Sequence, residues 1–320
     1  MKNNNLENIK LAMAPMAGFT DRSFREICKN WGADISWSEM VSSEGLVRSM
    51  SKENKSLDIA KKFNKNENDY WVQIFGTNPF SMAKAAKIIE EKIQPSGVDI
   101  NMGCPVKKAK RAGYGAIQMN NISQIIEIIK ETKKTIKVPL SLKTRLGITN
   151  QDEVLTWAPQ LEKAGIDQLV VHARTLRGMF KEEPAWQIVR KLNSLLSIPV
   201  IYNGGIKTPE DALFYAQKTS CKTLMIGQAM IGRPWIFKEI KYYLKSKEKI
   251  SITATEKKDT ILSHAKLAKK YFGEKNIISF RVHLLAYLRG SVNAAELRRE
   301  AIKIQKFEDV EIIVKKIKFK

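Results

Sequence analysis

The chain has 320 residues, of which 43% are hydrophobic and 28% are charged, and its formal net charge is +22. This balance is typical of soluble globular proteins, and no stretch approaches the roughly 18 uninterrupted apolar residues of a membrane span. The three cysteines, Cys28, Cys104 and Cys221, form no CxxC pair, which argues against a disulfide framework or a metal site and predicts a cytoplasmic protein. Residues 1–5 lack the apolar core of a signal peptide.

Half of the excess positive charge lies in the last quarter of the chain. Residues 241–320 contain 20 Lys and Arg against nine Asp and Glu, whereas the first 240 residues contain 35 against 24. Such a concentration indicates a polyanionic partner such as nucleic acid. A Lys-rich solvated surface without a partner is the alternative that charge alone leaves open.

Strand-like runs alternate with helical segments over the first 235 residues. The predicted strands begin near Leu11, Ile35, Tyr70, Val98, Pro139, Gln168, Ile198 and Thr223. The predicted helices between them cover residues 21–31, 79–92, 122–134, 153–164, 185–195 and 208–217. Eight such repeats predict a (β/α)8 TIM barrel, with a doubly wound sheet as the alternative; the absence of a clear reversal point favours the barrel.

After Trp235 the alternation stops and the pattern is helical to the end of the chain. Helices are expected over residues 235–247, 255–271, 277–288 and 293–303, and from residue 307 onward, with Gly273 and Gly290 at two helix ends. We therefore divide the chain into a barrel domain, residues 1–245, and a basic all-α helical bundle domain, residues 246–320.

The stretch from Gly97 to Lys108 places a thiol at the end of a strand. Apolar Val98, Ile100 and Met102 alternate with polar or small residues, the strand breaks at Gly103, and Cys104 follows. A basic, glycine-containing loop, residues 107–115, comes next. A thiol on such a turn is a candidate for chemistry, although a structural cysteine is an equal alternative from this stretch alone.

Polar side chains recur where the other predicted strands end. They are Gln73, Asn101, Ser141, Lys143, Arg145, His172, Arg174 and Asn203. In a barrel these ends meet at one mouth, and buried polar groups are costly unless paired, so core packing explains the set poorly. Cationic Lys143, with His172 near it, suits an anionic ligand or developing negative charge.

Glycines follow the seventh and eighth predicted strands, in Asn203-Gly204-Gly205 and in Gly227-Gln228. These are the loops where barrels bind phosphate through exposed backbone N–H groups. A phosphate there, with Gln73 and Lys143 facing the barrel axis, fits flavin mononucleotide (FMN).

These residues resemble the tRNA-dihydrouridine synthase family, most closely its bacterial B-type subfamily. The resemblance rests on six motifs in order: APMAGFTD from Ala14, SEMVSSEGL from Ser38, DINMGCPVKK from Asp99, KTRLG from Lys143, HART from His172 and GRPW from Gly232. It implies an FMN-binding barrel followed by a helical domain that helps to hold tRNA.

Carried over by position, the resemblance implies two groups of ligand contacts. FMN is expected to contact Pro15, Met16, Ala17, Gln73, Lys143, His172, Asn203, Gly204, Gly205, Gly227 and Gln228. The uracil base is expected to contact Asn101, Arg145 and Arg174.

The resemblance also implies a reaction in which NADPH or NADH reduces FMN, hydride passes to C6 of uracil, and Cys104 protonates C5. A free thiol, with a pKa near ~8.5, is mostly protonated at neutral pH, as an acid must be. The base must leave its stack to be reached. The partner is then tRNA, in its D-loop region, and the enzyme is expected to be a monomer. Candidate tRNA contacts are Arg281, Arg289, Arg298 and Arg299.

The chain departs from the family pattern at three positions. Many relatives have Asp where this chain has Gly205, Arg where it has Gln228, and a smaller residue where it has Tyr114. Losing an Arg at the phosphate site is expected to weaken FMN binding by about 1–3 kcal/mol. Two alternatives remain from sequence: a flavin-dependent reductase of a free pyrimidine or another small molecule, and a tRNA-binding protein without catalysis.

Overall fold

The computed structural model describes residues 6–48, 69–179 and 181–319. The prediction that residues 1–5 form no signal peptide concerns residues outside these ranges. None of the helices in these ranges has the length and apolar character needed to cross a membrane.

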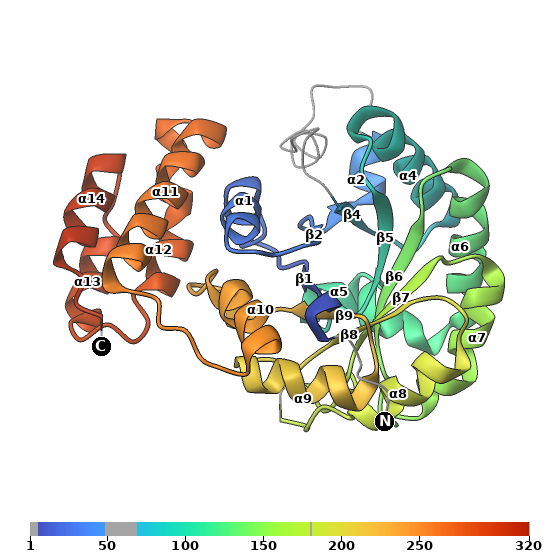
Figure 1. The fold of residues 1–320 in the computed structure, drawn as a ribbon. Coiled ribbons are helices and arrows are strands. Elements are labelled where there is room, and N and C mark those ends of the chain that lie inside the picture. Colours follow the sequence, from blue (N-terminus) through green and yellow to red (C-terminus); the bar gives the residue numbers. More distant parts are fainter. Residues whose placement is uncertain (1–5, 49–68, 180, 320) are drawn as a thin grey trace.

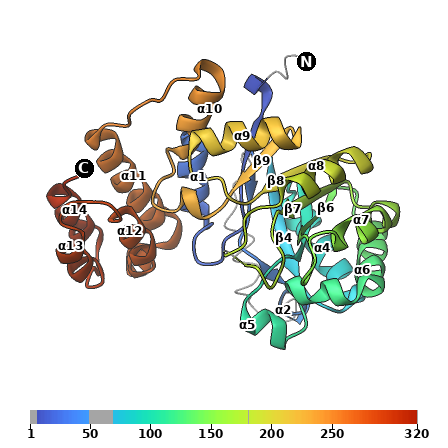
Figure 2. The ribbon, with the colours of Figure 1, turned by 90° about the horizontal axis from the view of Figure 1, so that it is seen from below.

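One parallel sheet closes on itself to form the barrel (Figures 1 and 2). Its strands are β1 (Lys10–Met13), β2 (Ser36–Trp37), β3 (Val41–Ser42), β4 (Tyr70–Phe75), β5 (Gly97–Met102), β6 (Leu140–Arg145), β7 (Gln168–His172), β8 (Val200–Asn203) and β9 (Thr223–Ile226). Neighbours pair in chain order from β4 to β9, β9 pairs with β1, and a bridge from Ala12 to Ile35 completes the ring. The predicted (β/α)8 barrel is confirmed, and the doubly wound sheet is excluded.

The second barrel strand is split into two short pieces. β2 and β3 both pair with β4, at Tyr70 and Trp71 and then at Ile74 and Phe75. Between them the Ser38 hydroxyl accepts a hydrogen bond from the Gln73 backbone N–H at 2.9 Å. A side chain thus replaces the missing ladder contact, which keeps the two pieces aligned.

Helices surround the barrel close to their predicted ranges. They are α1 (Arg22–Asn30), α4 (Pro79–Ile93), α6 (Ile122–Thr135), α7 (Glu153–Ala164), α8 (Trp186–Leu195) and α9 (Pro209–Thr219). Asn78 and Thr208 cap α4 and α9, each followed by a proline in the first turn. These capping signals explain why the two helix starts were predicted well.

The end of the barrel interior where β4 and β5 begin is filled by aromatic and aliphatic side chains. Trp37 and Trp71 stack with ring centroids 5.7 Å apart. A Cβ atom at Gly97 would lie 2.3 Å from the Trp71 ring, so this glycine makes room for the indole. The polar side chains at the C-terminal ends of the strands are consequently confined to the opposite end of the barrel, its mouth.

The C-terminal region is helical, as predicted. It comprises α10 (Ile236–Ser246), α11 (Ala254–Phe272), the 3-10 segment η5 (Glu274–Phe280), α12 (Arg281–Tyr287), α13 (Ala294–Ala301) and α14 (Phe307–Lys316). The predicted helix 277–288 is therefore divided at residues 280–281 into a 3-10 and an α-helical part. Figure 1 shows α1 and α10 between the barrel and helices α11–α14.

Short helices occupy segments in which no helix was expected. They are α2 (Ser43–Arg48), α5 (Lys107–Arg111) and the 3-10 segments η1 (Leu6–Asn8), η3 (Gly115–Asn120) and η4 (Gln228–Met230). The basic segment after Cys104 is thus a one-turn helix, α5, rather than an irregular loop. Its Ala109 is fully buried, which anchors the turn on the barrel.

Candidate active site

Cys104 lies on a tight turn directly after β5. Its backbone N–H donates to Asn101 Oδ1 at 3.1 Å, and its carbonyl accepts from the Ala116 N–H at 3.0 Å. A Cβ atom at Gly115, whose φ is +74°, would lie 2.8 Å from that carbonyl oxygen. The turn is therefore fixed from both sides and leaves the thiol half-buried at the barrel mouth.

A chain of amide hydrogen bonds crosses from β4 to β5 beneath this turn. Gln73 Nε2 donates to Asp99 Oδ2 at 2.6 Å, and Gln73 Oε1 accepts from Asn101 Nδ2 at 2.8 Å. Asn101 Nδ2 also lies 3.0 Å from Met40 Sδ. All three members of the chain are buried, so the Asp99 carboxylate orients Gln73, and Gln73 orients Asn101.

Asp99 was not among the predicted site residues. Burial raises its pKa to about 6, although the hydrogen bond from Gln73 and the charge of Lys143 act in the opposite direction. The signal was present in the sequence, because Asp99 shares the polar face of the strand with Asn101. The prediction covered only polar residues at the strand end, and Asp99 lies two positions before Asn101 on the same face.

Lys143 on β6 faces the barrel interior, as predicted. Its Nζ donates to Asn203 Oδ1 at 3.0 Å, while Asn203 Nδ2 donates to the Met225 carbonyl at 2.8 Å. Burial lowers the pKa of Lys143 to about 8, with Arg145 adding to the effect and Asp99 opposing it. The ammonium group is thus a half-buried cation whose charge is incompletely compensated, as expected of a group that meets an anionic or electron-rich ligand.

Two arginines, Arg145 and Arg174, lie near the Cys104 turn at the ends of β6 and β7. Arg145 Nε donates to the Gly103 carbonyl at 3.0 Å, and its Nη1 donates to the Thr175 carbonyl at 3.1 Å. Burial lowers the pKa of Arg145 to about 10, and the neighbouring charge of Arg174 adds to the effect. Arg174 itself is buried and donates from Nε to the Glu182 carbonyl.

His172 stands at the end of β7 between these cations. Burial, followed by the charges of Arg145, Lys143 and Arg174, holds the pKa of His172 well below its usual range. The ring is therefore neutral at physiological pH. A neutral imidazole can donate or accept one hydrogen bond without adding charge to the mouth.

The glycines after β8 permit close packing at the strand end. Gly204 and Gly205 have φ values of +125° and +75°, and a Cβ atom at Gly205 would lie 2.7 Å from both Pro184 and the Tyr215 hydroxyl. Successive backbone groups in such conformations can present N–H groups to an anion. After β9, a Cβ atom at Gly227 would lie 3.9 Å from Met16 Sδ, which joins this end to the loop after β1.

The remaining predicted contacts are more peripheral. Pro15 and Met16 are half-buried, whereas Ala17 and Gln228 are exposed. Tyr114 packs on Phe75 with ring centroids 4.2 Å apart and lies close enough to Cys104 for the two groups to interact electrostatically. Tyr114 thus forms a wall of the mouth on the Cys104 side.

A further polar cluster, absent from the sequence prediction, joins the barrel to the C-terminal helices. His283 Nε2 lies 3.0 Å from Asp21 Oδ2, and Asp21 Oδ1 caps α1 by accepting from Phe24 N–H at 3.0 Å. The two nitrogens of His264 lie 3.0 Å from the Tyr287 hydroxyl and 3.1 Å from the Ser23 hydroxyl. Because both nitrogens have protein partners, the cluster is a hydrogen-bonded link between α1, α11 and α12.

The mouth as a whole brings neutral amides, one neutral imidazole and the cations Lys143 and Arg145 together beside a thiol. Lys143 and Arg145 both lie within electrostatic range of Cys104. Such residues suit a planar, electron-rich heterocycle whose polar edge meets amides and whose developing negative charge meets cations. The incompletely compensated Lys143 and the glycine-bearing ends of β8 and β9 fit a flavin with its phosphate.

The fold and the mouth together define a (β/α)8 barrel with a half-buried thiol at its mouth, extended by a basic helical region. Comparison with known proteins specifies the class: the Dihydrouridine synthase (Dus) family matches residues 12–320, and the chain belongs to that family.

The "Probable tRNA-dihydrouridine synthase" of Aquifex aeolicus is 31% identical over 298 residues, covering 92% of this chain and 91% of the relative. The "tRNA-dihydrouridine synthase B" of Vibrio cholerae is 35% identical over 294 residues, covering 90% and 89%. The "Probable tRNA-dihydrouridine synthase" of Helicobacter pylori is 33% identical over 292 residues, covering 90% and 85%.

Proposed function

We propose that this protein reduces the C5=C6 bond of uridine in tRNA to 5,6-dihydrouridine, using FMN and NADPH or NADH. The observation that carries the proposal is the position of the Cys104 thiol at the barrel mouth, beside Lys143 and Arg145, in a chain of the dihydrouridine synthase family. Neither a structural cysteine nor a simple RNA-binding surface requires a thiol held beside two cations of the barrel interior.

The residues that would hold FMN are those that the family resemblance assigns to it. Lys143 and His172 would face the ring from β6 and β7, and Gln73 would offer its amide from β4. The backbone of Asn203, Gly204, Gly205, Gly227 and Gln228 would contact the phosphate, and Pro15, Met16 and Ala17 would close the remaining side. When bound, the flavin supplies the hydride that is added to C6.

Cys104 completes the reduction by giving its proton to C5, so that two electrons and two hydrogens are added to the base. The resulting thiolate is stabilised by the charges of Lys143 and Arg145 until it regains a proton from solvent. Asn101 is held by Gln73 and orients the uracil, and Arg145 and Arg174 contact its carbonyl side. Proton transfer from a positioned acid of this kind contributes typically 10²–10⁴-fold to rate.

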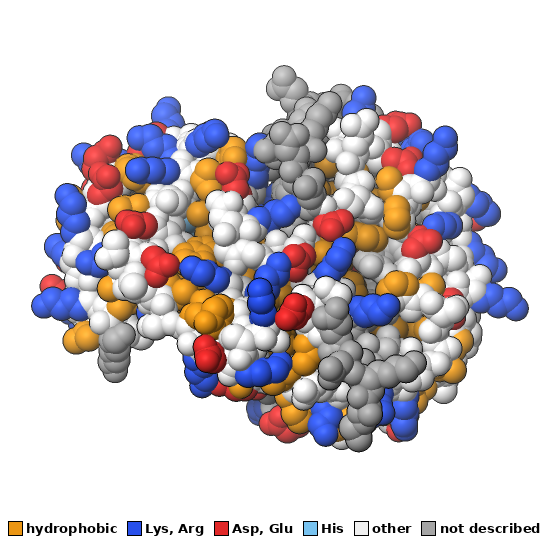
Figure 3. All heavy atoms as spheres, viewed as in Figure 1, with side chains coloured by type: hydrophobic (Ala, Val, Ile, Leu, Met, Phe, Trp, Pro, Cys, Tyr) orange, Lys and Arg blue, Asp and Glu red, His pale blue; other side chains and the backbone are white. Residues whose placement is uncertain are grey.

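The C-terminal helices supply the surface for tRNA, in its D-loop region. Figure 3 shows Lys and Arg side chains spread over both the helical region and the barrel on one face. A buried cluster of apolar residues from Trp235 to Ile317 is distinct from the barrel core, which supports a tRNA-binding domain over residues 246–320. We further propose a cytoplasmic monomer, in keeping with a tRNA substrate.

One experiment tests this function against its alternatives. The purified protein is incubated with NADPH and unmodified tRNA, and dihydrouridine is measured by mass spectrometry of the digested nucleosides. We expect a yellow protein that forms dihydrouridine in tRNA and leaves free uridine unchanged. Reduction of free pyrimidines alone indicates the small-molecule reductase, whereas a colourless protein that binds tRNA without product indicates a binding protein. Flavin-loaded protein without product overturns the proposal.

A further inference from the structure

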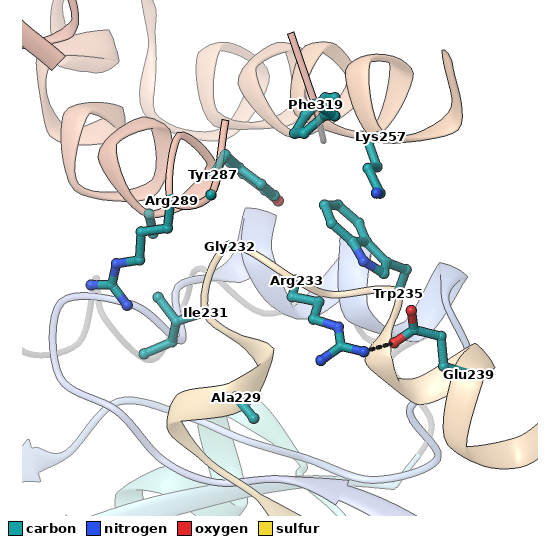
Figure 4. A pocket seen from close by; sticks show the side chains of 12 residues that line it. Ala229, Ile231, Gly232, Arg233, Trp235, Glu239, Lys257, Tyr287, Arg289 and Phe319 are labelled. Carbon is teal, nitrogen blue, oxygen red and sulfur yellow. Dashed lines mark ion pairs between the residues drawn. The ribbon is translucent and has the colours of Figure 1, made fainter. Parts of the chain in front are cut away.

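A pocket lies between the turn after β9 and the C-terminal helices, and its lining includes none of the residues of the Cys104 turn. It has a volume of about 460 Å³ and is lined by both regions of the chain (Figure 4). The barrel side contributes the Gly232–Trp235 turn and Glu239, and the helical side contributes Lys257, Arg289 and Phe319. The GRPW motif from Gly232, which connects β9 to α10, therefore forms one wall of this pocket.

The walls of this pocket are held in fixed positions. Gly232 has a φ of +76°, and a Cβ atom there would lie 2.4 Å from the Ala286 carbonyl oxygen, so the turn meets α12 backbone to backbone. Trp235 stacks on Tyr287 with ring centroids 6.2 Å apart, and both side chains are buried. Phe319 is fixed by a backbone bridge to Ser291. The pocket thus exists before a ligand arrives.

The charges of the pocket are unequally compensated. Arg233 forms an ion pair with Glu239 at 2.7 Å, which neutralises both groups. Neither Lys257 nor Arg289 has a carboxylate within 4.0 Å in the described ranges of the chain. Lys257 Nζ instead lies 5.9 Å from the Trp235 ring centroid and 5.3 Å from that of Phe319. Two cations are consequently available to an anionic ligand.

We propose that this pocket binds a nucleotide unit, with phosphate groups at Arg289 and Lys257 and the ribose or base against Phe319. Figure 4 shows the two cations on opposite sides of the Gly232–Trp235 turn. Every nucleoside within an RNA strand has a phosphate on each side, which matches two separated cations with aromatic surface between them. The pocket volume is large enough for one such unit.

The assignment of this nucleotide to the RNA substrate rests on the proposed function. NADPH is the other source of the same chemistry, since it too has separated phosphate groups and aromatic bases. The pocket is distinct from the mouth at which Cys104 acts, so it would hold the substrate at a distance from the reacting base.

The test uses the full-length protein with Arg289→Gln and Lys257→Gln, and with Arg190→Gln on the outer helix α8 as a matched control. Arg289 and Arg190 are both exposed, so neither change disturbs the core, and thermal unfolding verifies that Lys257→Gln is folded. Binding of unmodified tRNA is measured by filter retention at several salt concentrations. We expect each pocket variant to bind roughly tenfold more weakly and to lower the slope of log K against log salt by about 0.7–1. Arg190→Gln should match wild type in both quantities.

A second measurement, reduction of the bound flavin by NADPH without RNA, distinguishes the two sources. An unchanged NADPH concentration dependence, together with weaker tRNA binding, supports the RNA strand. A raised NADPH requirement with unchanged tRNA binding assigns the pocket to the dinucleotide. If neither quantity changes in Arg289→Gln or folded Lys257→Gln, the pocket proposal is wrong even if wild-type protein forms dihydrouridine. Conversely, weaker tRNA binding by the variants, without product from wild type, supports the pocket and contradicts the proposed reaction.

Discussion

His283 Nε2 on α12 lies 3.0 Å from Asp21 Oδ2, although the two residues are 262 positions apart in the chain. Asp21 also caps α1, directly after the loop that contains Pro15, Met16 and Ala17. The contact therefore connects the C-terminal helices to a loop of the barrel mouth. Burial raises the pKa of Asp21, but the hydrogen bond and charge of His283 outweigh this effect and hold it well below its usual range.

This pair is expected to stabilise the contact between barrel and helices. Asp21→Asn and His283→Gln should each destabilise the protein, and their double-mutant cycle in chemical unfolding should give a coupling energy of about 1–3 kcal/mol. Asn at position 21 preserves the helix cap, which isolates the pair from capping. Additive effects of the two changes would show that the contact contributes no energy.

Stability should decrease as pH falls below about 6.5. Burial holds the pKa of His172 and of His264 well below the usual range, so the folded state excludes protons that the unfolded state binds below about 6.5. Each group contributes a slope of up to about 1.4 kcal/mol per pH unit, and stability rises with pH. Asp99, with a pKa raised to about 6, acts in the opposite direction between about pH 4 and 6.

Chemical unfolding at a series of pH values tests this predicted pH dependence of the free energy of unfolding. We expect His264→Gln to remove one of the two histidine slopes while leaving the other. An identical pH dependence in wild type and His264→Gln would contradict a neutral, buried His264.

Cys104→Ala should separate flavin reduction from uridine reduction. Without the thiol, C5 has no positioned acid, and we expect dihydrouridine formation to fall by about 10²–10⁴-fold. Flavin colour and NADPH oxidation should be unchanged, because neither requires that proton. Cys221→Ala, which removes a buried thiol after α9, is the control. Full activity of Cys104→Ala on tRNA would exclude Cys104 as the proton donor.

Asp99→Asn should disturb the mouth without touching a ligand. The Asp99 carboxylate accepts from Gln73 Nε2, and this orientation leaves Gln73 Oε1 to accept from Asn101. An amide at position 99 can present a donor instead, which favours rotation of the Gln73 amide and breaks its bond to Asn101. We expect flavin affinity to fall roughly tenfold or more, measured by flavin fluorescence titration. Asp259→Asn on the surface of α11 should leave it unchanged; equal affinities in all three proteins would show that Asp99 does not orient Gln73.

Gln228→Arg should strengthen flavin binding by about 1–3 kcal/mol, if a charged hydrogen bond to the phosphate is gained. Gln228 is exposed at the start of η4, directly after β9, so the longer side chain can be accommodated. Gln217→Arg, at an exposed position of α9, adds the same charge away from the mouth and is the control. Flavin affinity measured at two salt concentrations checks the result, and an equal gain in both variants would indicate a general effect of charge.

Local sequence patterns predict the barrel, the ends of its strands and the position of the Cys104 thiol. Alternation of apolar and polar residues is a local property, and in parallel strands it predicts which side chains reach the mouth, as with Lys143 and Asn203. Capping residues such as Asn78 and Thr208 are also local, and they placed two helix starts correctly. The family motifs then gave these positions their expected roles.

The contacts between distant segments depend on how the elements pack in three dimensions. Asp99 became a positioning residue because Gln73 on the adjacent strand faces it, and His283 became a partner of Asp21 because α12 packs against α1. The pocket of Arg289 and Lys257 likewise requires the turn at Gly232 to meet α12. These relationships depend on how helices and strands pack across the whole chain, and no local periodicity encodes that packing.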